Sequence, residues 1–346
     1  MRYILLLVIV VVAAYFSEAG RLDCPPSSET KNMATYSWRQ AYWTGQDTTF
    51  IDFFKSDVSK DYNRGDVYLN VADASNVGKI IHPERLAELI ANFRKVSGNS
   101  ARFYLFYAQG GGDDKKWAPD FVRVFKEFIL KYGNPDMGSL GISFHVKLDL
   151  ATWYKIFDAF DALKTDPQFK PYNIALDVTM NYYNTDRKLV DQIMFRADHV
   201  TLLTFANTSP RLINFFVVFL TKICPNCNNN YYPNYKAKIT FLAEGDCNSG
   251  ACSKTSMCAY YSDRLDNPNG GILYAYNQLS TALDYVRDHV LSKDKFDYFF
   301  EAGGTHIGLN FFSWVMCYYG SESWHQIGLQ KCISDYQSAS QICRQG

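Results

Sequence analysis

The chain has 346 residues, with 35 Lys and Arg against 35 Asp and Glu, so its formal net charge is zero at pH 7. This balance gives no electrostatic basis for binding nucleic acid or an acidic membrane surface. The length suits one α/β barrel, and no low-complexity linker divides the chain, so a single large domain is expected.

Residues 1–19 have the features of a secretory signal peptide. A short apolar run follows Met1-Arg2, and Ser17-Glu18-Ala19 supplies the small-x-small pattern that precedes a cleavage site. The run is shorter than the roughly 20 residues that a spanning helix needs. We therefore expect a secreted protein comprising residues 20–346, with no membrane attachment after cleavage. An uncleaved membrane anchor is the alternative.

Short β-rich runs alternate with amphipathic helical runs along the rest of the chain. The runs that predict strands are rich in β-branched and aromatic residues, and the first of them is the weakest. The predicted strands are 34–38, 66–73, 102–109, 141–149, 173–180, 199–205, 237–244 and 307–314.

Apolar stripes and end signals predict the helices between these strands. Pro83 suits a first helical position, and Gly133 suits a helix end. The predicted helices are 83–96, 119–133, 153–160, 186–196, 209–223, 277–292 and 322–338.

Strands that alternate with helices pair in parallel, because each helix crosses back over the sheet. A closed (β/α)8 barrel of the TIM type explains the order and length best, and an open doubly wound sheet is the alternative. No GxGxxG or P-loop turn follows a predicted strand, so no nucleotide cofactor is expected. In such a barrel the functional site lies at the C-terminal ends of the strands.

Nine cysteines lie beyond the signal segment. In an oxidising compartment they predict about four disulfides and one thiol, with Cys332 and Cys343 a candidate pair from proximity alone. The cluster at 224, 227, 247, 252 and 258 is also compatible with a zinc site or a redox CxxC, but no His lies within it. The six His residues show no HxH or HExxH spacing, so we expect no catalytic metal.

Several of these motifs occur in a recognisable order. The run DVYLNVADAS at 66–75 is followed by a strand ending Ala108-Gln-Gly-Gly, a helix ending LKYG, and Gly141-Ile-x-Phe-x-Val. This order resembles glycoside hydrolase family 18, the chitinases and chitinase-like lectins. The segments 200–205 and 308–314 resemble that family's sixth and eighth strands. The resemblance spans roughly residues 33–320 and implies a secreted barrel that binds N-acetylglucosamine-containing glycans.

The fourth strand departs from the family pattern at every catalytic position. In the family it reads Asp-Gly-x-Asp-x-Asp-x-Glu, where the Glu protonates the glycosidic oxygen and the substrate's own acetamido group attacks the anomeric carbon. Aligned on Gly141, the four acids correspond to Leu140, Ser143, His145 and Lys147. An ammonium group is a poor proton donor at neutral pH, so the resemblance implies a scaffold without its hydrolytic chemistry.

Two other strands lack family residues as well. The Tyr-Asp pair of the sixth strand corresponds to Phe205-Ala206, and a Ser of the third strand corresponds to Ala108. Phe205 has no hydroxyl to support an acetamido group.

Polar residues near the predicted strand ends are candidates for ligand binding. His145, Lys147 and Asp149 alternate with apolar residues, so a strand would point them to one side. A Lys inside the barrel needs a carboxylate partner, which Asp149 or Asp177 could supply. Glu244 at the end of the seventh strand could pair with Asp149, as two carboxylates do in other barrel glycosidases.

Aromatic residues near strand ends are candidates for stacking against a sugar, with core packing as the alternative. They are Trp117, Trp314, Tyr182 and Tyr183, of which Trp314 is the strongest. Asn207-Thr208-Ser209 matches the glycosylation sequon, although Pro210 follows it.

The sequence therefore predicts a secreted, disulfide-stapled chitinase-like barrel that binds carbohydrate without hydrolysing it. A divergent hydrolase using Glu244 with Asp149 and a non-catalytic protein that binds an extracellular protein are the alternatives. The residues expected to contact a ligand are His145, Lys147, Asp149, Asp177, Phe205, Glu244 and Trp314.

Overall fold

The computed structural model describes residues 33–37, 40–45, 48–55, 66–97, 102–110, 112–181, 186–204, 208–243, 281–300 and 307–309. The predicted signal segment 1–19 and the predicted helix 322–338 lie outside these residues. Within the described ranges, no helix is long and apolar enough to cross a membrane.

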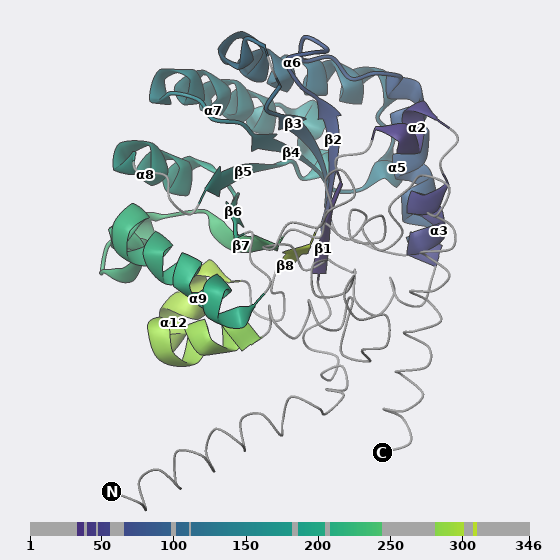
Figure 1. The fold of residues 1–346 in the computed structure, drawn as a ribbon. Helices are drawn as coiled ribbons and strands as arrows, with labels where there is room; N and C mark the ends of the chain where they lie inside the picture. Colours follow the sequence, from purple (N-terminus) through teal and green to yellow (C-terminus); the bar gives the residue numbers. More distant parts are fainter. Residues whose placement is uncertain are drawn as a thin grey trace, which may run out of the picture.

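Parallel strands form the centre of the molecule, and each pairs with its neighbour in the sequence (Figure 1). The short strand β8 pairs with β7 on one side and with β1 on the other. The predicted mixed α/β fold with a parallel sheet is therefore confirmed. The strands are β1 (Met33–Ser37), β2 (Val67–Ala72), β3 (Phe103–Ala108), β4 (Leu140–His145), β5 (Ala175–Asn181), β6 (His199–Leu203), β7 (Lys238–Ala243) and β8 (Ile307–Leu309).

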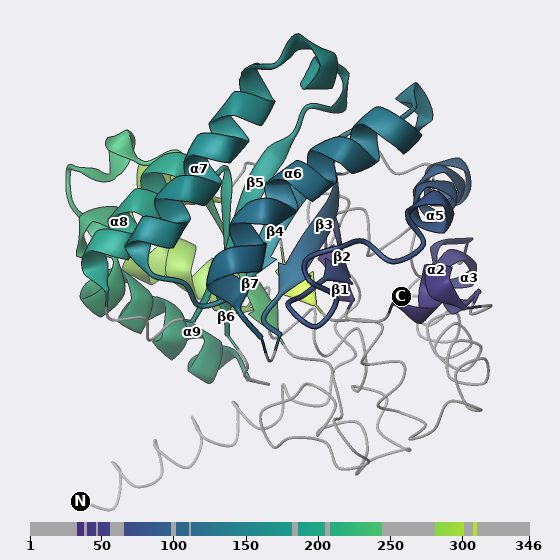
Figure 2. The ribbon, with the colours of Figure 1, turned by 90° about the horizontal axis from the view of Figure 1, so that it is seen from above.

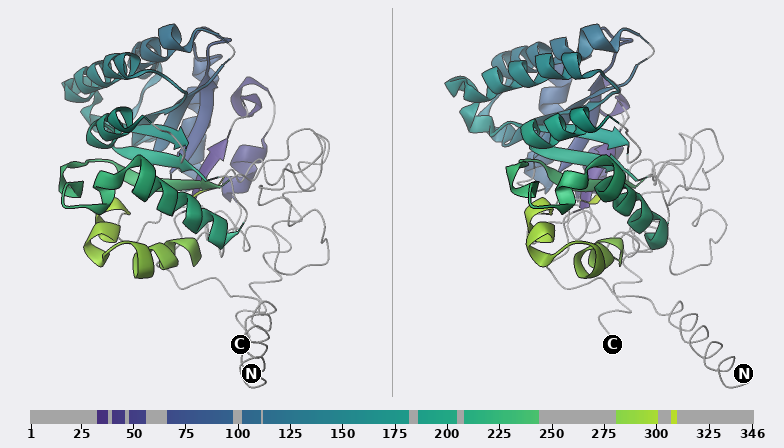
Figure 3. Two further views of the ribbon diagram at one scale, coloured as in Figure 1. Left: turned by 60° about the vertical axis from the view of Figure 1, so that its left-hand side comes forward. Right: turned by 90° about the vertical axis from the view of Figure 1, so that its left-hand side faces the viewer.

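Helices lie along the outer side of these strands (Figures 1 and 2). Helix α6 lies beside α7 (Figure 2), and α9 lies beside α12 (Figure 3). The ring centroids of Phe216 on α9 and Phe300, the residue after α12, are 5.6 Å apart. The helices are α2 (Ala41–Thr44), α3 (Thr49–Lys55), α5 (Pro83–Ser97), α6 (Asp114–Tyr132), α7 (Leu150–Thr165), α8 (Arg187–Arg196), α9 (Ser209–Val218) and α12 (Lys293–Phe299). The sequence did not predict α2, α3 or α12.

Short helical turns complete the described structure. The 3-10 turns are Pro135–Met137, Pro167–Tyr172, Pro225–Asn228 and Tyr232–Asn234, and the π turns are Phe219–Ile223 and Val286–Val290. The first π turn continues α9, so the single helix predicted over 209–223 changes its hydrogen-bonding pattern after Val218.

Successive side chains of each strand alternate between the two faces of the sheet, which creates two apolar layers. The outer layer, between the strands and the helices, is the larger and includes Phe103, Leu105 and Tyr107 of β3. The inner layer includes Tyr104, Phe106 and Ala108 of the same strand.

Three stacked tyrosines fill part of the inner face. The ring centroids of Tyr36 and Tyr68 are 5.1 Å apart, and those of Tyr68 and Tyr104 are 4.4 Å apart with only 3° between the planes. The Tyr104 hydroxyl lies 2.5 Å from Nδ1 of His199. A Cβ at Gly141 would lie 2.3 Å from the Tyr104 ring, so the stack requires glycine at this position on β4.

Strand β4 ends four residues earlier than predicted. The sequence predicts a strand over 141–149, whereas β4 stops at His145 and α7 begins at Leu150. Asp149 is the N-cap of α7, and its Oδ1 accepts a hydrogen bond of 2.8 Å from the Thr152 backbone N–H. The capping geometry takes Asp149 out of the strand, so the predicted alternation of His145, Lys147 and Asp149 on one side does not hold.

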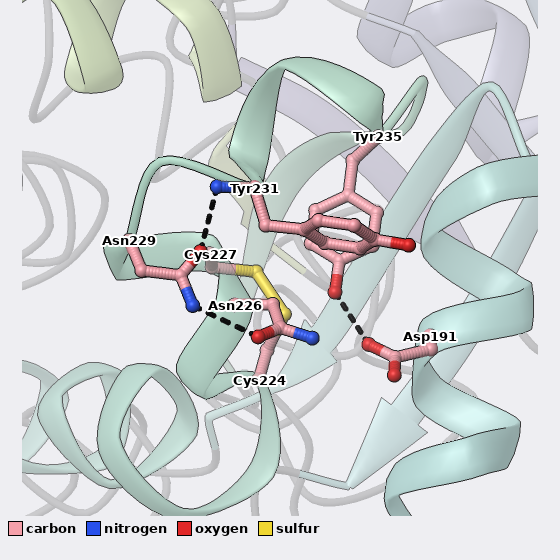
Figure 4. Close-up of a disulfide and its surroundings, with 7 residues drawn as sticks. All are labelled: Asp191, Cys224, Asn226, Cys227, Asn229, Tyr231 and Tyr235. Carbon is pink, nitrogen blue, oxygen red and sulfur yellow. Dashed lines mark hydrogen bonds between the residues drawn. A yellow bond between two sulfur atoms is a disulfide. The ribbon is translucent and has the colours of Figure 1, made fainter.

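A disulfide closes the turn after α9 (Figure 4). It joins Cys224 and Cys227, whose Cα atoms are 5.4 Å apart and whose side chains are fully buried. The nearby Tyr235 hydroxyl donates a hydrogen bond to Asp191, which ties this segment to α8. The other cysteines, Cys332 and Cys343 among them, lie outside the described residues.

Candidate functional site

A pocket of about 380 Å³ lies at the C-terminal ends of β4, β5 and β6. We call it the rim pocket. Its polar lining comes from Gln109 after β3, His145 and Lys147 at and after the end of β4, and Thr179 and Asn181 on β5. Among the described residues that line it, none is an aspartate or a glutamate. The described part of the lining therefore offers hydrogen-bonding groups and the ammonium of Lys147, but no carboxylate.

His145 is neutral in the folded protein. Its Nδ1 lies 3.4 Å from the Tyr36 hydroxyl, which in turn lies 3.4 Å from the Thr179 hydroxyl. Desolvation by the surrounding protein lowers the pKa of His145 from 6.5 to about 4. A neutral imidazole offers one donor and one acceptor, so His145 suits the binding of a hydroxyl or amide better than that of an anion.

Lys147 lies at the opening of the rim pocket with an exposed side chain. The expectation that Asp149 or Asp177 forms an ion pair with it is wrong. Asp149 instead pairs with Lys115 of α6, with Nζ 2.7 Å from Oδ2. Because Lys147 follows the end of β4, it reaches solvent and needs no partner inside the sheet.

Asp149 serves the helix rather than the pocket. Hydrogen bonds from Lys115 and Thr152 hold the pKa of its carboxyl well below the ordinary value. Both of its oxygens are engaged, since Oδ1 accepts from Thr152 and Oδ2 contacts Lys115. The carboxylate is therefore permanently ionised at neutral pH, and it does not line the rim pocket.

Asp177 lies deep on the inner face of β5 and not at the strand end. It is fully buried, and its register partner on β4 is Ser143. The Ser143 hydroxyl donates a hydrogen bond of 2.6 Å to Oδ2, and the Thr201 hydroxyl donates one of 2.8 Å to Oδ1. The structure therefore does not bring Asp177 together with His145 and Lys147.

The four positions aligned with the family's acids have separate roles. Leu140 packs in the outer apolar layer, Ser143 binds Asp177, and His145 and Lys147 line the rim pocket. Ala108, aligned with the family's serine, is buried on the inner face and is the register partner of His145. A proton-donating carboxyl group is thus absent from each aligned position.

Of the aromatic residues predicted to stack on a sugar, the structure describes Trp117. Trp117 lies on α6, packs against the outer layer, and has Lys116 Nζ 4.3 Å from its ring centroid, so it does not reach the pocket. The other predicted site residues that lie outside the described ranges are Tyr182, Tyr183, Phe205, Asn207, Glu244 and Trp314. Within the described ranges, no group of three or more His, Cys, Asp or Glu could hold a metal ion.

Three polar lining residues were missed from the sequence. Gln109 directly follows β3, and Thr179 and Asn181 continue the inner-face series of β5 that begins with Asp177. The period of two along β5 was a usable signal, because every second residue from Asp177 is polar.

No protein-family model matches the chain, and no curated protein matches its sequence. The fold is similar to that of concanavalin B, with a TM-score of 0.44 and 13% identity over 88% of this chain and 99% of that one. It is also similar to class V chitinase from Nicotiana tobaccum, with a TM-score of 0.46 and 10% identity over 88% and 98% of the two chains. A third match is the carboxyl transferase domain of Rhizobium etli pyruvate carboxylase, with a TM-score of 0.38 and 10% identity over 91% and 56%. Likeness at this level concerns the fold alone.

Proposed function

We propose that the protein is a secreted, chitinase-like (β/α)8 barrel that binds carbohydrate, above all N-acetylglucosamine-containing glycans, without hydrolysing it. The observation that carries the proposal is the chemistry of the rim pocket. The amides of Gln109 and Asn181, the hydroxyl of Thr179 and the neutral imidazole of His145 all line it. Such neutral donors and acceptors match sugar hydroxyl and acetamido groups.

The chemistry of the described part of the pocket supports the proposal that the protein does not hydrolyse glycans. Glycosidic cleavage needs a group that protonates the leaving oxygen near neutral pH. His145 is unprotonated there because its pKa is about 4, and no carboxyl group lines the described part of the pocket. The resemblance of the fourth strand to family 18, with its acids replaced, supports the same conclusion.

Two features support the wider proposal of a secreted barrel. The pairing of β8 with both β7 and β1 supports closure of the strands β1 to β8 into a barrel. The Cys224–Cys227 disulfide is of a kind that forms in oxidising compartments, which supports removal of residues 1–19 as a signal peptide.

Calorimetric titration with N,N′,N″-triacetylchitotriose tests the binding, and product analysis by chromatography tests the chemistry. We expect binding without turnover. Asn181→Ala should weaken binding at least tenfold, equivalent to about 1.4 kcal/mol. Gln168→Ala removes an exposed amide on the 3-10 turn Pro167–Tyr172, outside the pocket, and should leave the affinity unchanged.

Other outcomes favour the alternatives. Release of reducing sugar that is abolished by Glu244→Gln would show that the protein is a hydrolase that depends on Glu244. Failure of wild-type protein to bind any glycan would instead favour an extracellular protein partner. Trp314→Ala should weaken glycan binding about tenfold if that indole stacks on the sugar.

A further inference from the structure

The strands β4 and β5 part before they reach the rim. Their pairing ends at Phe144 and Val178. Each strand keeps its other neighbour for longer: His145 still pairs with Ala108 of β3, and Asn181 still pairs with Leu203 of β6. The end of β4 is therefore paired with β3 and the end of β5 with β6, but the two ends are not paired with each other. We call this unpaired boundary between β4 and β5 the seam.

The rim pocket lies where this pairing ends. It is lined by His145 and Thr179, which lie on the inner face with Tyr36, and also by Val146, Val178 and Met180, which belong to the outer apolar layer. Because adjacent residues of a strand point to opposite faces, a pocket that touches both sets extends over the strand ends, beyond the last paired residues of β4 and β5.

Beyond the seam the pocket is apolar. Its walls there are Leu148 after β4, Trp153 of α7, and Leu189 and Ile193 of α8. We call this part the lateral chamber. All four side chains belong to the buried outer layer, so water inside the chamber would have few hydrogen-bonding partners. The described walls therefore favour an apolar group over a second sugar ring.

We propose that the physiological ligand is a glycoside that carries an apolar substituent longer than acetyl. The sugar occupies the polar mouth near His145, Thr179 and Asn181, and an alkyl or aryl substituent enters the lateral chamber through the seam. This inference rests on the proposed function, because it assigns the sugar to the same polar groups. An unsubstituted chitin oligosaccharide would leave the chamber unused.

A chain-length series tests the inference on the unaltered protein. The probes are the methyl, butyl and hexyl glycosides of N-acetylglucosamine, measured by calorimetry with 1-hexanol as the sugar-free control. Each methylene that enters an apolar site improves affinity by about fourfold, so the hexyl glycoside should bind at least about tenfold more tightly than the methyl glycoside. Hexanol alone should bind more weakly than the hexyl glycoside.

A chamber-filling variant adds a second test. Leu189→Phe should weaken hexyl-glycoside binding at least about tenfold and leave methyl-glycoside binding unchanged. The matched control is Leu163→Phe. Leu163 is a buried leucine near the C-terminal end of α7, and it does not line the pocket. Thermal unfolding tests whether both variants fold. If either variant does not fold, the chain-length series on the unaltered protein still tests the inference.

The outcomes separate the inference from the proposed function. Equal affinity for the methyl and hexyl glycosides would overturn the inference that the lateral chamber binds the substituent, and it would leave the proposal of carbohydrate binding intact. Failure of every glycoside to bind would overturn both. Hexanol binding as tightly as the hexyl glycoside would also overturn the inference, because the sugar would then contribute nothing.

Discussion

Acidification should destabilise the protein through His145. The pKa of this histidine is 6.5 ordinarily and about 4 in the folded protein. The fold therefore favours the neutral form, and between these two values the unfolded chain binds a proton that the folded chain does not. The contribution is fully present above pH 6.5 and is lost as the pH falls toward 4. At about 1.4 kcal/mol per pH unit, it corresponds to roughly 3 kcal/mol of unfolding free energy.

Urea denaturation between pH 7.5 and pH 4, compared with His145→Gln, isolates this contribution. Glutamine keeps a donor and an acceptor but does not titrate, so the wild type should lose roughly 3 kcal/mol more than the variant across this range. His289→Gln, which alters an exposed histidine, controls for general acid effects. Parallel pH profiles for wild type and His145→Gln would refute the reasoning and show that His145 is not desolvated.

Three further predictions concern other parts of the fold. Gly141→Ala should destabilise the protein by about 2–3 kcal/mol, because its Cβ would meet the Tyr104 ring at 2.3 Å, and Tyr104→Leu in the same chain should relieve part of this loss in urea denaturation. Replacing Cys224 and Cys227 by Ala should lower stability by about 2 kcal/mol, since the disulfide closes a very short loop, and thiol reagents should not label either cysteine in the native wild type. Lys147→Ala should leave the urea midpoint unchanged; a marked loss would place the ammonium in an internal ion pair.

The sequence alone determined the order of the strands and of the helices between β2 and β7. The aromatic-rich run that predicts β3 and the apolar stripe that begins at Pro83 are local patterns, and both elements form where they were predicted. Period two and period 3.6 arise from backbone geometry, so a short window is enough to recognise them.

Tertiary structure decided which polar groups meet. Asp149 lies two residues from Lys147, yet its ion pair is with Lys115 on another helix. Asp177 was expected at the rim, but it is buried inside the sheet, where it accepts hydrogen bonds from Ser143 and Thr201. No local pattern contains these choices, because capping and hydrogen bonding in three dimensions select among partners that are equally available along the chain.

The opening between β4 and β5 is the clearest case. Nothing in the residues after Phe144 and Val178 marks the end of their pairing, because both segments continue with alternating polar and apolar residues. The seam opens because Asp149 turns the chain after β4 into α7, while β6 holds the end of β5. Local periodicity could predict both strands, but only the packing of elements distant in the sequence determines how far they stay paired and where the pocket forms.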